Sequence, residues 1–150
     1  MQNNADVIVV GKGNAALCAA LEARYAGANV IMLEAASEEE SGGNSRFAGG
    51  MMRFTYNGIE DLRTLLEITD EEARNTDWDT NTVDEFYDDL YKVTNYRTDP
   101  RLSELLITRS LESMQWLRKQ GVHFVLNYRR SEEHTSELQS LAYLVCRLLL

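Results

Sequence analysis

Short apolar runs flank a helix-like segment in the first 34 residues. Residues 6–11 contain the β-branched run Val-Ile-Val-Val, which predicts a strand buried on both faces. Residues 14–26 are rich in alanine and leucine and precede Gly27, a typical helix stop. Residues 29–34 repeat the strand pattern. Together these segments predict one βαβ unit with a right-handed crossover.

A polar, glycine-rich segment follows over residues 35–58, and it is too long for an ordinary connection inside a compact domain. Its glycines alternate with Phe47, Met51, Met52 and Phe54, a mixture that disordered linkers rarely contain. We therefore expect a loop with a function.

Helical patterns dominate the remainder. A capping box of Thr82 and Glu85 marks one helix start, and Asp99 followed by a proline marks another. The predicted elements are helices over residues 59–72, 83–92 and 100–121, and a strand over residues 122–126. The fold class expected from the whole pattern is α/β.

Composition and charge exclude several classes. The 150 residues are 44% hydrophobic and 26% charged, which is typical of one globular domain. The net charge of −9 argues against a nucleic-acid partner, because such proteins neutralise phosphates with lysine and arginine. The N-terminus has no secretory signal, and no apolar run is long enough to span a bilayer. We therefore expect a cytoplasmic protein with no direct membrane segment.

The turn between the first strand and the helix carries a candidate dinucleotide site. Gly11, Gly13 and Ala16 form a Gly-x-Gly-x-x-Ala pattern, in which bare backbone and a helix N-terminus can approach a pyrophosphate. The pattern alone also fits any tight strand-to-helix turn. Glu34 ends the second strand 23 positions after Gly11, where an acid can bind a ribose hydroxyl. The acid favours an unphosphorylated ribose, as in FAD or NAD.

A second motif separates flavin from nicotinamide. The string GGNSRFAGG over residues 42–50 resembles the second FAD-binding stretch of the fumarate reductase and succinate dehydrogenase flavoprotein family. Residues 10–20, 33–36 and 88–94 extend the resemblance to the tricarballylate dehydrogenase-like branch. The resemblance covers residues 1–129. It implies a Rossmann-type FAD-binding βαβ unit followed by helices that begin a capping region, in an incomplete domain.

The resemblance also implies a cofactor, its contacts and a chemistry. FAD would contact the first turn through its pyrophosphate, Glu34 through its adenosine ribose, and the second motif on its flavin side. The implied cofactor-binding residues are Gly11, Gly13, Asn14, Ala15, Ala16, Glu34, Ala35, Gly43, Asn44, Ser45, Ala48, Gly49 and Gly50. The implied reaction is hydride transfer between flavin N5 and a small-molecule di- or tricarboxylate, as when tricarballylate is oxidised to cis-aconitate.

No catalytic residue is assigned within this chain. In the family, the side chains that bind carboxylates and move the proton lie well downstream of residue 129. The chain is therefore expected to be an N-terminal fragment that is inactive and retains FAD weakly or not at all. The expected partner of the full-length enzyme, besides its substrate, is an unidentified electron acceptor.

The last 21 residues have a separate explanation. Residues 130–140, RSEEHTSELQS, match the translation of a common sequencing-library adapter, and residues 143–150, YLVCRLLL, match its second constant block in the same frame. We therefore expect residues 130–150 to be a non-native tail, produced by adapter read-through.

Several residues look chemical without forming a site. His123 beside a predicted strand and Cys18 among alanines are typical packing residues. The acidic stretch over residues 77–89 fits no metal-binding loop and indicates a solvated helix face. No metal site is predicted.

Two other functions remain open on the sequence alone. An NAD-dependent dehydrogenase would share the first glycine motif but leave residues 42–50 without a role. A small, non-catalytic nucleotide-binding module complete at 150 residues would require a genuine tail.

Overall fold

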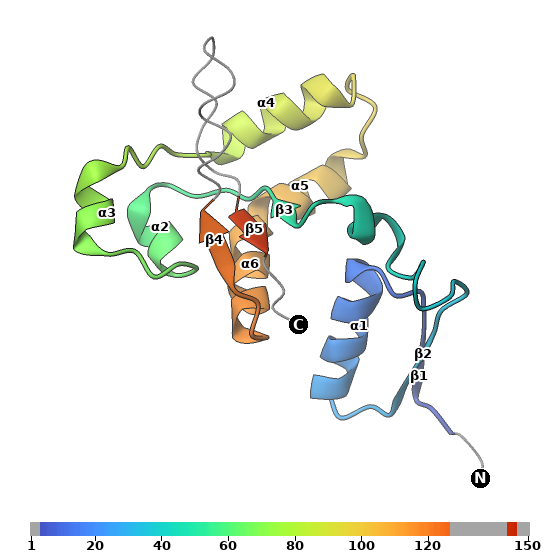
Figure 1. Cartoon of the computed structure of the whole chain (residues 1–150). Coiled ribbons are helices and arrows are strands. Elements are labelled where there is room, and N and C mark those ends of the chain that lie inside the picture. Colours follow the sequence, from blue (N-terminus) through green and yellow to red (C-terminus); the bar gives the residue numbers. More distant parts are fainter. Residues whose placement is uncertain (1–3, 127–143, 147–150) are drawn as a thin grey trace. The chain divides into compact units, whose positions relative to one another are not determined.

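A computed structural model describes residues 4–126 and 144–146 of the chain (Figure 1). The chain divides into two compact units, Met1–Gly50 and Met51–Leu150. Most of the segment that resembles an adapter lies outside the described residues.

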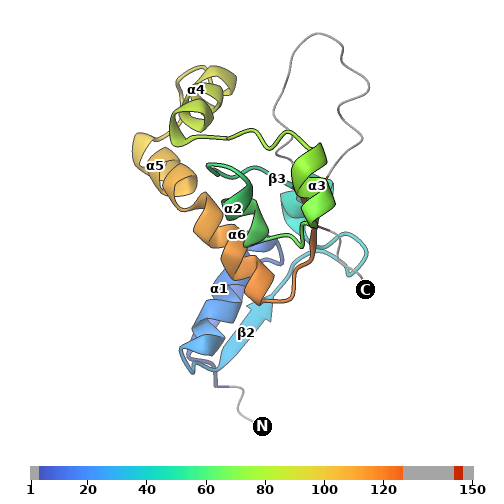
Figure 2. The same cartoon turned by 90° about the vertical axis from the view of Figure 1, so that its left-hand side faces the viewer.

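The first unit contains the predicted βαβ arrangement. Strand β1 (Val7–Val10) is followed by helix α1 (Asn14–Tyr25) and strand β2 (Val30–Leu33). The strands pair in parallel, from Val7 opposite Val30 to Val10 opposite Leu33. Helix α1 packs along the strand pair, as Figure 2 shows for α1 and β2. The α/β class and the strand–helix–strand order are thus confirmed.

The expected burial of β1 on both faces is wrong for the described chain. Ile8 is 61% exposed and Val10 is 80% exposed, whereas Val7 and Val9 are half-buried. Successive strand side chains point to opposite faces, and this two-stranded sheet is covered by one helix. One face of β1 therefore carries apolar side chains without cover.

The second unit combines helices with a small antiparallel sheet. Its three strands lie in the order β3-β5-β4, and β5 falls within the segment that resembles an adapter. The elements are β3 (Met51–Met52), α2 (Ile59–Arg63), α3 (Asp70–Asn75), α4 (Val83–Val93), α5 (Pro100–Thr108), α6 (Ser110–Lys119), β4 (Phe124–Leu126) and β5 (Leu144–Cys146).

One apolar cluster holds the second unit together. Phe54 and Leu65 have no exposed surface, and the Phe54 and Tyr56 rings lie 5.5 Å apart. Helix α6 contributes Met114, and Phe124 comes from β4. The chain that leaves the first unit therefore enters directly into the core of the second.

Two predicted helices are each divided in the structure. The helix expected over residues 59–72 ends at Arg63, and α3 starts after Thr69, which forms a capping box with Glu72. The helix expected over residues 100–121 breaks at Arg109. There the Ser110 hydroxyl donates to the Ile107 carbonyl at 2.8 Å, a local bond that competes with regular helix geometry.

The capping box at the start of α4 is confirmed and supports a stability prediction. The Thr82 hydroxyl accepts from the Glu85 amide at 3.3 Å, and Glu85 Oε2 accepts from the Thr82 amide at 2.7 Å. We expect Thr82→Ala to lower the free energy of unfolding by about 1 kcal/mol. Urea denaturation measures the change. Thr82→Ser keeps the hydroxyl and should remain close to wild type; equal losses in both variants would contradict the capping role.

The phenol of Tyr56 should ionise late. Burial raises its pKa to about 12, and the carboxylates of Asp79 and Glu85 add to the shift. Folding thus favours the neutral phenol, so this stabilisation is complete below the ordinary value of 10.0 and is lost as the pH rises through about 12. An ultraviolet titration should show a phenol that ionises at about pH 12, and Tyr56→Phe should remove this step. A titration curve that Tyr56→Phe leaves unchanged in this range would contradict the assignment.

Candidate cofactor-binding site

The turn after β1 extends the parallel pairing by one bond before the chain changes direction. The Gly11 amide donates to the Leu33 carbonyl at 2.7 Å. Gly11 has a φ of 109°, a conformation that favours glycine, and a Cβ there would lie 3.8 Å from the Ala16 Cβ. The turn therefore sets the start of α1 beside the end of β2, where Glu34 follows.

Helix α1 begins with Gly13 as its N-cap and Asn14 as its first residue. Ala15 and Ala16 complete a first turn that carries small side chains except at Asn14. The first amides of an α-helix have no carbonyl partners within the helix, and the helix dipole makes this end positive. This end of α1 can therefore receive an anion such as a pyrophosphate.

The second glycine motif lies against this helix end. The Ser45 Oγ accepts a hydrogen bond from the Asn14 amide at 3.0 Å. A Cβ on Gly13 would lie 3.4 Å from the Gly42 carbonyl oxygen and 3.6 Å from the Ser45 Oγ. The two motifs, which are separated by β2 in the sequence, thus form one surface. Gly42 was not among the predicted site residues, although the pair Gly42-Gly43 in the sequence could have indicated it.

Glu34 stands at the same edge of the sheet, immediately after β2. Its Oε1 accepts a hydrogen bond from the Ala36 amide at 2.9 Å, which folds the carboxylate back over Ala35. Because Gly11 and Leu33 are hydrogen-bonded, the carboxylate and the glycine turn follow neighbouring strand ends. A dinucleotide whose phosphates meet α1 would place its ribose at this edge.

The remainder of the second motif forms a short 3-10 helix, η1 (Gly43–Phe47), where only a loop was expected. Asn44 is exposed on it, and the Ala48 amide closes it with a 3.4 Å bond to the Ser45 carbonyl. Gly49 and Gly50 follow with φ values of 64° and 71°. These left-handed conformations favour glycine.

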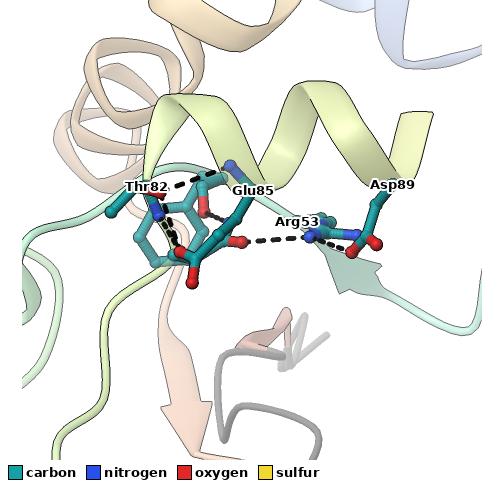
Figure 3. A network of polar contacts seen from close by, with 6 residues as sticks. Arg53, Thr82, Glu85 and Asp89 are labelled. Atoms are coloured by element: carbon teal, nitrogen blue, oxygen red, sulfur yellow. Dashed lines mark hydrogen bonds and ion pairs between the residues drawn. The ribbon is translucent and has the colours of Figure 1, made fainter. Parts of the chain in front are cut away.

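Arg53, in the second unit, was not predicted as a site residue, and its side chain makes structural contacts with neighbouring side chains (Figure 3). Its Nη2 lies 2.5 Å from Asp89 Oδ2 and donates to Asn81 Oδ1 at 3.0 Å. Its guanidinium lies 4.7 Å from the centre of the Phe86 ring. These contacts join the segment after β3 to α4, and no local sequence pattern predicts them.

The Arg53 charge also acts on the neighbouring capping box. Hydrogen bonds from the Thr82 amide and hydroxyl lower the pKa of Glu85, and the positive charge of Arg53 lowers it further. Glu85 is therefore held ionised as the N-terminal carboxylate of α4. Arg53 is engaged in this network and stands as a structural residue.

Other candidate chemistry is sparse in the part of the chain that the structure describes. Burial, reinforced by Glu22, raises the pKa of the Cys18 thiol, which disfavours the reactive thiolate. Within residues 4–126 and 144–146, no three histidine, cysteine or acidic side chains cluster as metal ligands would. Over the same residues, no helix has the length and apolar character needed to cross a membrane.

The first unit thus has the features of a dinucleotide-binding βαβ protein. Residues 6–142 match the family described as FAD binding domain, and the chain belongs to this family. The match identifies FAD as the cofactor. The match also ends within the segment that resembles an adapter.

Three reductases show the range of similar proteins. A fumarate reductase (cytochrome) from Shewanella frigidimarina is 31% identical over 116 residues, which cover 77% of this chain and 18% of that protein. A vinyl phenol reductase from Lactiplantibacillus plantarum is 30% identical over 119 residues, 79% of this chain and 21% of the relative. A digoxin reductase from Eggerthella lenta is 47% identical over 47 residues, 31% of this chain and 8% of the relative. The chain thus spans about a fifth of the first two relatives.

The residues present fit the ADP half of FAD. The glycine at position 13 supports this fit, because a side chain there would fill the space between α1 and the second motif. Amides at the start of α1 suit the pyrophosphate, and the Glu34 carboxylate suits ribose hydroxyls. The geometry brings together the sites predicted at Gly11, Gly13, Asn14, Glu34 and Ser45.

Proposed function

We propose that this chain is the N-terminal, FAD-binding part of an FAD-dependent oxidoreductase that acts on a small di- or tricarboxylate. The observation that carries the proposal is the joining of the two glycine motifs at the N-terminus of α1 through Ser45 and Asn14. A nicotinamide-dependent dehydrogenase would need the first motif alone. The named fumarate reductase relative and the resemblance to tricarballylate dehydrogenases both support a carboxylate substrate.

Each part of the site has a separate proposed role. The turn and helix start formed by Gly11, Gly13, Asn14, Ala15 and Ala16 receive the pyrophosphate, and Glu34 with Ala35 holds the adenosine ribose. The flavin side is bound by Gly43, Asn44, Ser45, Ala48, Gly49 and Gly50. Bound FAD supplies a ring that accepts or donates hydride, and the chain positions it by backbone contacts and keeps its phosphates neutralised.

The 150-residue chain itself should not catalyse the reaction. The two relatives that match most of the chain are about four times as long, and we place the substrate-binding and proton-transfer groups outside residues 1–129. The purified chain should be colourless after gel filtration and should not reduce an artificial acceptor when tricarballylate is added. A yellow, active preparation would contradict the assignment as a fragment.

A test of the substrate class needs the uninterrupted reading frame. We expect the longer protein to purify with FAD and to reduce fumarate with reduced viologen, or to oxidise tricarballylate with an artificial acceptor. A digoxin-like or vinylphenol substrate turned over in preference to every carboxylate would reject the carboxylate class while leaving the FAD assignment intact.

We further propose that residues 130–150 are translated adapter. The resemblance of residues 130–140 and 143–150 to two constant blocks in one frame supports this. Sequencing of the genomic locus by an adapter-free method should read a frame that departs from this sequence after codon 129. Finding the same codons followed by a stop in the genome would refute the proposal and favour a small nucleotide-binding module.

We propose that the longer enzyme works in the cytoplasm with an electron acceptor that is not yet identified. Cell fractionation with an antibody against residues 4–126 tests the location, and recovery in the membrane fraction after high-salt washing would contradict it.

A further inference from the structure

Helix α1 lacks a cap from its own N-cap residue. Serine, threonine, asparagine and aspartate are preferred at this position because their side-chain oxygens accept from first-turn amides. Gly13 occupies it with φ −78° and ψ 172°, an extended conformation that any residue adopts. Backbone conformation therefore does not require glycine at position 13.

Close packing favours glycine instead. A Cβ on Gly13 would stand 3.4 Å from the Gly42 carbonyl oxygen, at the short limit of ordinary van der Waals contact, and 3.6 Å from the Ser45 Oγ. The missing side chain makes room for a hydroxyl from elsewhere. Ser45, 31 positions later, fills the capping role and accepts from the Asn14 amide at 3.0 Å.

We propose that Ser45 is a positioning residue that caps α1 from the second motif and thereby fixes the flavin side of the site to the pyrophosphate side before the cofactor arrives. The inference rests on the proposed function, because it concerns the same FAD site. Its physical basis is pre-organisation: a loop already held in the bound conformation loses less freedom when the ligand binds.

The cap predicts a selective effect on ligands. FAD spans both motifs, so loosening the second motif should weaken FAD. AMP reaches only the ribose and the first phosphate, so its affinity should not depend on Ser45. Ser45→Ala should raise the Kd for FAD about three- to tenfold, the range expected for one hydrogen bond, and leave the Kd for AMP unchanged. Ser45→Thr retains a hydroxyl and should restore FAD affinity.

A second measurement separates capping from direct contact with the cofactor. In the FAD-free 150-residue chain, amide hydrogen exchange by NMR should be faster at Asn14 in Ser45→Ala than in wild type, with the exchange at Val9 in β1 unchanged. If Ser45 acts only on FAD, the Asn14 amide exchanges equally in both proteins, which overturns the inference. Ser45→Ala weakening AMP as much as FAD would overturn it too.

The two proposals fail in different ways. If the longer protein with the uninterrupted reading frame binds neither FAD nor AMP, the proposed function fails, whereas faster Asn14 exchange in Ser45→Ala would still establish the cap. If FAD binds normally and Asn14 exchange is unaffected by the substitution, the cap fails and the FAD assignment stands.

Discussion

Phe54→Ala is expected to lower the free energy of unfolding of the second unit by about 3–5 kcal/mol. The side chain has no exposed surface and packs against Tyr56 with ring centres 5.5 Å apart. Truncation therefore leaves a cavity that the surrounding core side chains cannot fill. Urea denaturation followed by tryptophan fluorescence measures the loss, because Trp78 packs against the same core.

Phe47→Ala is the matched control for this prediction. Phe47 is 83% exposed, so the same truncation there should change the free energy of unfolding by less than about 0.5 kcal/mol. Equal losses at the two positions would contradict the placement of Phe54 in the core. A loss at Phe54 below about 1 kcal/mol would contradict it as well.

Gly13→Val should weaken FAD binding tenfold or more, a change of at least about 1.4 kcal/mol. Valine adds a Cβ 3.4 Å from the Gly42 carbonyl oxygen and two further methyl groups beyond it. The second motif must then move away from α1, so that the two motifs no longer form one surface for the cofactor. Quenching of flavin fluorescence during titration gives the affinity.

Ala19→Val provides the control, since Ala19 is an exposed residue within α1, away from its first turn. This substitution places a valine elsewhere on the same helix, and it should leave the FAD affinity within twofold of wild type. Gly13→Val with unchanged affinity would show that the cofactor does not enter between α1 and Ser45.

The local part of the fold could be predicted because its signals lie close together in sequence. The β-branched run, Gly27 and the capping box of Thr82 and Glu85 each act over a few residues, and the structure confirms the elements that they mark. The helix expected over residues 59–72 was too long because Thr69 and Glu72 form a second capping box, which the sequence contains.

Long-range contacts could not be predicted in this way. The bond between Asn14 and Ser45 and the ion pair of Arg53 with Asp89 each join residues more than 30 positions apart. Spacing predicted that Glu34, 23 positions after Gly11, would bind the ribose of a dinucleotide held at the glycine turn. Spacing did not predict that the absence of a side chain at Gly13 leaves room for the Ser45 hydroxyl.

The most direct test of the account is an NMR titration of the uniformly labelled 150-residue chain with FAD, and in parallel with NAD⁺. FAD should shift the amides at the start of α1, beside Glu34 and in residues 43–50 with one common Kd. NAD⁺ should shift the first two groups, together with Ser45 through its bond to Asn14, and leave Gly49 and Gly50 unchanged. Shifts confined to the second unit, or the same response to both cofactors in residues 43–50, would contradict the claim that these motifs form one FAD site.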